Sequence, residues 1–272
     1  MAGGDMDIAS RRPLGRTKLK LSPIGFGAFK IGRNEGIKYR EGYDLPSDAE
    51  SDRILHGVLD LGVNLVDTAP AYGISEGRIG RALAARRDSF VLSTKVGETW
   101  EDGRGRYDFS SQAVDASLDR SLQRLRTDHL DIVLVHSDGR DLEIIDQGEA
   151  LDTLARRRDR GDIGHVGFSG KTVEGHRAAM DSGVVDVLMV EYHDLDRSQA
   201  PVIEEAAARG IGVLVKKGLA SGRIPAHQAI PACLEPPGVA SVVIGSLNLE
   251  HLRGNLEIAT RVIEDPDQTS SR

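Results

Sequence analysis

The sequence predicts a single (β/α)8 barrel, and three observations lead to that fold class. Short runs rich in Val, Ile and Leu recur eight times along the 272 residues, and none alternates between apolar and polar positions. Such runs are typical of parallel strands that are buried on both faces. Amphipathic stretches separate the runs, which gives about 34 residues for each strand and helix, as in a barrel of this class.

The expected elements alternate from one end of the chain to the other. The eight strands are expected at 21–27, 64–67, 90–95, 130–136, 165–169, 185–192, 211–216 and 239–245. The helices between and after them are expected at 49–61, 76–86, 110–125, 148–160, 173–182, 198–209 and 249–262. Three side chains are expected to cap helix N-termini: Ser110, Thr172 and Asn248. Three helices are expected to close on a glycine: Gly62, Gly183 and Gly210.

An open, doubly wound sheet is the competing fold. That fold would need a phosphate-binding glycine loop after the first strand, and Gly25, Gly27 and Gly32 are spaced too loosely to form one. No linker or composition shift marks a second domain. We therefore expect residues 14–262 to form one barrel, with flexible ends at 1–10 and 265–272.

Composition excludes several classes of function. Lys and Arg total 35 against 42 for Asp and Glu, and this net charge of −7 argues against nucleic-acid binding. The lone Cys233 excludes an internal disulfide and fits a reducing compartment. Neither a secretory signal nor a run of about 18 apolar residues is visible. A cytoplasmic protein is expected, with a small-molecule substrate, no membrane partner and no metal site, and its oligomeric state is left open.

Polar residues end nearly every expected strand, and the active sites of barrels lie at those ends. Lys95 would lower the pKa of the Tyr72 phenol and make it a usable acid, while Asp67 would pair with Lys95. His136 would donate a hydrogen bond to a carbonyl oxygen. Alone, the Asp67–Lys95 pair could be structural, and His136 or Tyr72 would more often be a packing residue. The four together favour carbonyl chemistry completed by a hydride from a cofactor.

The sequence around these four residues resembles the aldo-keto reductase family. The most specific segment is 61–73, which contains Asp67 and Tyr72. Further matching motifs occur in the family's order at 13–17, 21–27, 93–95, 117–122, 130–136, 167–169, 191–192 and 243–246. The resemblance covers about residues 14–262. It implies a barrel that binds NADP(H) or NAD(H) in extended form, with Tyr72 as the general acid in reduction and the general base in oxidation.

The cofactor pocket that the resemblance implies departs from the family pattern. Gly170 follows Ser169 where the family has Asn, and Met189 stands in place of a Gln. Lys216 takes the position of an aromatic residue that stacks on the nicotinamide ring. Gly218, in the next loop, is also placed among the cofactor contacts. These substitutions indicate an altered cofactor posture or weaker binding.

The phosphate end follows the family more closely. Gly245, Ser246 and Asn248 form a turn before a helix, where backbone N–H groups hold phosphate. His251 and Asn255 would lie at the adenosine end, with His251 in place of the usual Arg. Asn248 alone could equally be a plain helix cap. Family habit therefore favours NADP(H), while the residues leave NAD(H) possible.

Three residues are expected to line the substrate mouth: Phe29, Lys30 and Trp100. Trp100 is the sole tryptophan and lies in a polar loop. The long insertion 33–47 could cover the mouth, and the alternative is a solvated flap. An NAD(P)H-dependent oxidoreductase acting on an aldehyde or ketone, including a sugar-like one, is the favoured function. A non-redox isomerase or lyase and a nucleotide-sensing subunit are the alternatives.

Overall fold

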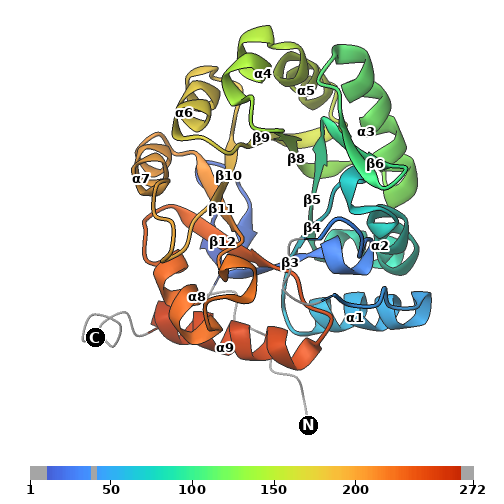
Figure 1. Cartoon of the computed structure of the whole chain (residues 1–272), viewed down its shortest axis with the longest axis vertical. Helices are drawn as coiled ribbons and strands as arrows, with labels where there is room; N and C mark the ends of the chain where they lie inside the picture. Colours follow the sequence, from blue (N-terminus) through green and yellow to red (C-terminus); the bar gives the residue numbers. More distant parts are fainter. Residues whose placement is uncertain (1–10, 38–41, 265–272) are drawn as a thin grey trace.

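The computed structural model describes residues 11–37 and 42–264, and it confirms the barrel. Eight strands pair in parallel and close into a ring in chain order, as right-handed βα winding requires. Figure 1 looks into this ring, with helices around its outside. The barrel strands are β3 (Ile24–Gly27), β4 (Leu65–Asp67), β5 (Val91–Val96), β8 (Leu130–His136), β9 (Ile163–Ser169), β10 (Val187–Glu191), β11 (Gly212–Lys216) and β12 (Val239–Ile244).

The outer layer contains two helices that the sequence analysis did not expect, α4 (Asp141–Gln147) and α8 (Ala226–Leu234). The first has only seven residues, and the second carries Pro231 in its interior, so neither gives a clear helical period. The helices are α1 (Asp48–Asp60), α2 (Ser75–Leu83), α3 (Ser111–Leu125), α4 (Asp141–Gln147), α5 (Glu149–Asp159), α6 (Val173–Asp181), α7 (Ala200–Ala208), α8 (Ala226–Leu234) and α9 (Leu249–Glu264). Within the described part of the chain, none of these helices is long and apolar enough to span a membrane.

The expected helix caps are present. Ser110 and Thr172 each accept a hydrogen bond from the backbone N–H three residues further on. Asn248 accepts one from the N–H two residues further on, at the start of α9. Gly62 and Gly183 follow their helices at φ values of +87° and +70°, where a side chain would be strained.

Aliphatic side chains fill the interior of the barrel toward the N-terminal ends of its strands. A hairpin of β1 (Arg12–Pro13) and β2 (Lys20–Leu21) precedes β3, and its Leu14 and Leu21 are fully buried. These two leucines pack with inward-facing residues of the strands: Leu65, Val91, Ile132, Leu134, Val187, Met189, Leu214 and Ala240. The polar residues at the opposite ends of the strands are thus supported by a packed core.

A second hairpin, β6 (Glu98–Glu101) and β7 (Arg104–Tyr107), rises directly after β5 and contacts the 3-10 turn η3 (Pro70–Tyr72). The sequence analysis treated this segment as a loop. The Asp102-Gly103 pair was the missed signal, because both residues have positive φ, as tight hairpin turns require. The expected flexible ends, 1–10 and 265–272, lie outside the described residues.

Candidate active site

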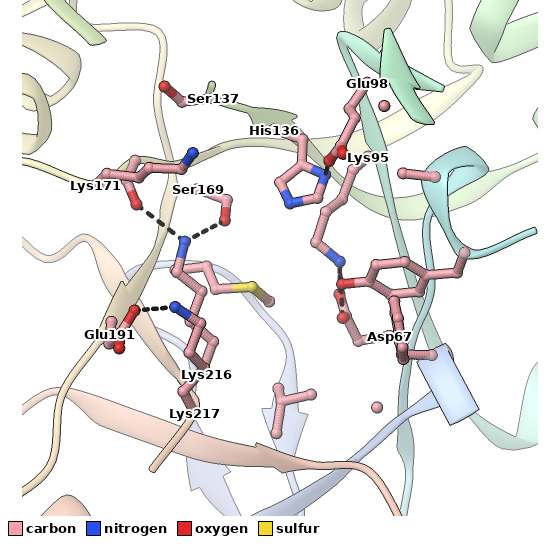
Figure 2. Close-up of a pocket in the computed structure, with 18 of the residues that line it drawn as sticks. Asp67, Lys95, Glu98, His136, Ser137, Ser169, Lys171, Glu191, Lys216 and Lys217 are labelled. Atoms are coloured by element: carbon pink, nitrogen blue, oxygen red, sulfur yellow. Dashed lines mark hydrogen bonds and ion pairs between the residues drawn. The ribbon is translucent and has the colours of Figure 1, made fainter. Parts of the chain in front are cut away.

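A cavity of about 640 Å³ opens at the C-terminal ends of the barrel strands. Its volume lies in the range of small-molecule and cofactor sites, about 300–1,000 Å³. Figure 2 shows how its charged side chains converge from different strands. Strand-end residues that line it are Gly27, Asp67, Lys95, His136, Ser169, Glu191, Lys216 and Gly245.

The expected pair between Asp67 and Lys95 forms at the ends of β4 and β5. Lys95 Nζ lies 2.8 and 2.7 Å from the two carboxylate oxygens, and it also donates to the backbone oxygen of Thr68 at 2.9 Å. Ser93 donates a further hydrogen bond to the carboxylate. Asp67 and Lys95 are buried, so each removes the cost of an unpaired charge from the other (Figure 2).

Tyr72 ends the turn η3 and faces the same pair. Lys95 Nζ lies 4.8 Å from the centre of its ring. Burial raises the pKa of the Tyr72 phenol, and this outweighs the opposing effect of Lys95, so the expectation of a lowered pKa is wrong. Burial lowers the pKa of Lys95, but attraction to Asp67 and Tyr72 is stronger and leaves that pKa raised.

His136, at the end of β8, has a carboxylate partner that the sequence analysis did not anticipate. Its Nδ1 lies 2.8 Å from Oε2 of Glu98 on the β6–β7 hairpin (Figure 2). The other oxygen of Glu98 accepts a hydrogen bond from the Tyr107 hydroxyl at 3.0 Å. Burial lowers the pKa of His136, opposed by Glu98. This contact joins the hairpin to the barrel at the cavity wall.

Lys216 enters the cavity from the end of β11. Its Nζ donates to Ser169 Oγ at 2.8 Å and to the backbone oxygen of Gly170 at 2.9 Å. Burial, and after it repulsion by the neighbouring Lys217, together lower the pKa of Lys216 to about 7. Lys217 itself forms an ion pair with Glu191, as Figure 2 shows. The cavity therefore has a readily neutralised amine on this side.

The residues expected to hold a cofactor divide into two groups. One group lines the cavity: Ser169, Gly170, Met189, Lys216 and Gly245. The other five, Gly218, Ser246, Asn248, His251 and Asn255, lie outside the cavity lining. The Ser169 hydroxyl and the Lys216 amine are donors that suit a carboxamide oxygen, and the cavity has sufficient volume, so the residues present fit a nicotinamide.

Gly218 is buried, and a Cβ there would approach Cys233 Sγ at 3.0 Å, so this glycine is required by barrel packing. On α9, Asn255 is buried while His251 is exposed. Asn248 caps α9, as the simpler reading of that residue expected.

Two of the three residues expected at the substrate mouth line the cavity. Phe29 lines the cavity with its ring edge-on to Tyr72, at 5.2 Å between centroids. Trp100 also lines it, and the Arg33 guanidinium, which sequence reasoning missed, lies 3.7 Å from the centre of its ring. Lys30 is not part of the lining, because its ammonium turns toward the ring of Tyr43, at 5.3 Å. Of the expected cover 33–47, residues 38–41 lie outside the described part of the chain.

Comparison with known proteins places this chain among the NAD(P)-dependent oxidoreductases. The chain belongs to the Aldo/keto reductase family, whose sequence profile matches residues 23–232. The Pseudomonas aeruginosa protein PA4992, itself a candidate aldo-keto reductase, is 44% identical with a TM-score of 0.85, over 93% of this chain and 96% of that one.

Two curated relatives extend the comparison. L-galactose dehydrogenase of Arabidopsis thaliana is 31% identical over 227 residues, which cover 78% of this chain and 66% of that enzyme. NADH-specific methylglyoxal reductase of Escherichia coli is 30% identical over 230 residues, which cover 78% of this chain and 69% of that enzyme. One of these relatives is named as a dehydrogenase of a sugar and the other as a reductase of methylglyoxal.

Proposed function

We propose that this protein interconverts an aldehyde or ketone and the corresponding alcohol by hydride transfer, with Tyr72 as the proton donor and acceptor. The observation that carries the proposal is the Lys95–Asp67 pair placed beside the Tyr72 ring at the open end of the barrel. A phenol next to a buried ammonium can give up its proton and regain it within one site. Ser169 and Lys216 supply donors for a nicotinamide.

A bound nicotinamide cofactor supplies or accepts the hydride. Tyr72 donates a hydrogen bond to the carbonyl oxygen and transfers its proton to that oxygen as the negative charge grows. Because burial raises the Tyr72 pKa, the phenol holds its proton until that moment. Lys95 then stabilises the remaining phenolate, and Asp67 keeps the Lys95 ammonium charged and directed at the ring.

The substrate class that we favour is a small carbonyl compound, including a sugar-like one. The open mouth is lined by Phe29 and Trp100, which provide apolar surface, and by charged groups that suit hydroxyls. L-galactose dehydrogenase and methylglyoxal reductase among the relatives agree with this class. The usual cofactor preference of the family favours NADP(H), and the NADH-specific relative leaves NAD(H) as an alternative.

The proposal is tested first by titrating NADPH, NADP+, NADH and NAD+ against the purified protein, with the fluorescence of Trp100 as the readout. Tight binding of one pair supports the proposal and selects the cofactor for a screen of aldehydes and alcohols. In that screen, Tyr72→Phe should lose turnover but bind the cofactor as the wild type does. Full activity of Tyr72→Phe would rule out the assigned role.

Lys216 favours a second candidate, a non-redox isomerase or lyase. Its pKa of about 7 leaves a large share of the amine neutral near neutral pH, and the amine faces the cavity. Failure of all four nicotinamides to bind, together with turnover of a hydroxycarbonyl compound without added cofactor, would favour this candidate. Tight cofactor binding without turnover would instead favour a nucleotide-sensing role.

A further inference from the structure

Lys216 is a lysine of the cavity wall that takes no part in proton transfer between Tyr72 and a carbonyl. Figure 2 shows it on the opposite side of the cavity from Asp67 and Lys95. Lys95 donates to three oxygens, and two of them belong to the Asp67 carboxylate. Lys216 instead donates to two uncharged oxygens and, within the described chain, has no carboxylate in an ion pair with it. It is therefore the cavity amine with the weakest hold on an extra proton.

The hydrogen bonds of Lys216 suit an uncharged amine. Its Nζ lies 2.8 Å from Ser169 Oγ and 2.9 Å from the Gly170 backbone oxygen, and no third partner lies among the residues that the structure describes. An ammonium has three hydrogens to donate, whereas a neutral amine has two hydrogens and one lone pair. The two oxygens therefore satisfy a neutral amine fully and leave its lone pair without a protein partner.

The charges around Lys216 also oppose an ammonium. Three lysines, one carboxylate and two histidines face the amine: Lys217, Lys95, Lys171, Glu191, His136 and His176. Burial, and after it the repulsion by Lys217 and Lys95, lowers the pKa of Lys216 to about 7. At pH 7 about half of the molecules hold a neutral amine here, against about one in 3,000 for a lysine in water. A desolvated amine beside other cations is the form of lysine that attacks a carbonyl carbon.

We propose that Lys216 forms a reversible imine with aldehydes that enter the cavity. The lone pair of Nζ attacks the carbonyl carbon, and a C–N bond forms while the carbonyl oxygen takes up a proton from the nitrogen. The carbinolamine then loses its hydroxyl group and the remaining N–H hydrogen as water, which leaves a C=N bond. The step needs no oxidant and no reductant. It is a covalent activity separate from hydride transfer.

Ser169 and Gly170 are placed to assist both stages of this reaction. The Ser169 hydroxyl is within hydrogen-bond distance of Nζ, so it can pass a proton from the nitrogen to the carbonyl oxygen. A protonated imine keeps one N–H, and the Gly170 backbone oxygen is positioned to accept it. The partners that hold the free amine therefore also suit the adduct.

The imine is tested by trapping it with propanal and sodium cyanoborohydride at pH 7, without added nucleotide. Cyanoborohydride reduces an imine to a stable amine, so the captured lysine carries a propyl group that peptide mass spectrometry locates. We expect Lys216 to be propylated at least about tenfold faster than Lys171, which lines the same cavity and is exposed. Lys171 is the internal control, because both amines meet the aldehyde in the same molecules. Equal rates, or faster labelling of Lys171, would overturn the inference.

Two variants separate this lysine from its neighbour in the chain. Lys216→Arg keeps a cation that can donate hydrogen bonds but removes the amine, so the rapidly labelled site should disappear. Lys217→Arg is the matched control and should retain it. A rapidly labelled site that persists in Lys216→Arg would refute the assignment. If Lys216→Arg does not fold, the relative labelling rates of Lys216 and Lys171 in the wild type remain decisive.

The reversibility of the adduct is measured separately. When cyanoborohydride is omitted, the extra mass should disappear once propanal is removed, because water hydrolyses an imine. An adduct on Lys216 that survives this treatment would refute a reversible imine. The labelling requires no hydride transfer, so a protein that binds no nicotinamide and reduces no aldehyde would overturn the proposed function without affecting this test.

Discussion

Replacing Lys216 by Met is expected to stabilise the protein, and the gain is expected to depend on pH. The pKa of Lys216 falls from 10.5 to about 7 in the folded protein, first because burial disfavours the ammonium and then because Lys217 and Lys95 repel it. The unfolded chain exposes this amine to water, where it regains its ordinary pKa. Folding therefore weakens proton binding at Lys216.

The sign and size follow from that difference. Between pH 7 and 10.5 the unfolded chain holds a proton that the folded protein has released, so the stability contribution of Lys216 rises with pH in this window. Below pH 7 both states are protonated and the whole penalty is present. The pKa difference corresponds to roughly 5 kcal/mol. Because Lys216 is only partly buried in an open cavity, solvent screening reduces our expectation to about 2 kcal/mol.

Urea unfolding of the wild type and Lys216→Met at pH 6, 8 and 10 measures the effect. We expect the variant to be more stable by about 2 kcal/mol at pH 6, with the difference shrinking by pH 10. Lys217→Met is the control, since Lys217 is exposed and paired with Glu191. Two results would contradict this: a variant that is no more stable than the wild type at pH 6, or a difference in unfolding free energy that does not change with pH. Either would show that the hydrogen bonds to Ser169 and Gly170 compensate fully for burial of the charge.

Three further results are expected. Tyr72→Phe should lower kcat about 100-fold or more while unfolding as the wild type does, measured by steady-state kinetics and urea titration. Lys95→Met should cost about 3–5 kcal/mol in unfolding free energy, because it leaves the Asp67 carboxylate buried without its partner; an unchanged urea midpoint would contradict this. The Kd of NADP+ should fall as pH rises from 6 to 8 and Lys216 loses charge, whereas the Kd of NADPH should change less, as followed by Trp100 fluorescence.

The barrel could be predicted from the sequence because its strands are buried on both faces. Such strands must be continuous and aliphatic, and each of the eight expected runs overlaps an observed strand. The β6–β7 hairpin could not be found in that way. Of its strands, β6 is half-buried and β7 is mostly exposed, and both carry charged residues. They therefore lack the aliphatic signal, and only the Asp102-Gly103 turn marks them.

The strand-end residues were predictable for a geometric reason. The C-terminal ends of all parallel barrel strands lie at the same end of the barrel, and this does not depend on the conformation of the loops. Asp67, Lys95 and His136 therefore converge on one cavity. Glu98 and Arg33 lie in segments whose direction depends on how the loops fold back. Their contacts with His136 and Trp100 therefore need coordinates.

Electrostatic balance was the least predictable property. Sequence reasoning counted Lys95 as a cation near Tyr72 and expected a lower phenol pKa. That argument omitted the cost of burying the phenolate, which exceeds the attraction of a lysine already paired with Asp67. The expectation that Lys30 lines the cavity also omitted a competing interaction, because its ammonium is attracted to the face of the Tyr43 ring.

The cavity contains cationic side chains that are paired with a carboxylate and one, Lys216, that is not. This difference affects how the cavity would bind the two oxidation states of a nicotinamide. Lys95 is paired with Asp67, and burial lowers the pKa of His136, which lies beside Glu98. Lys216 instead donates hydrogen bonds to two uncharged oxygens, so these partners do not cancel the positive charge of its ammonium in the cavity. An oxidised nicotinamide ring is positively charged and a reduced one is not, so Lys216 disfavours the oxidised form below pH 7. In the proposed reaction, charged Lys216 should therefore favour binding of the reduced cofactor over the oxidised one and oppose hydride transfer from the reduced cofactor, and both effects should fade as Lys216 loses its proton.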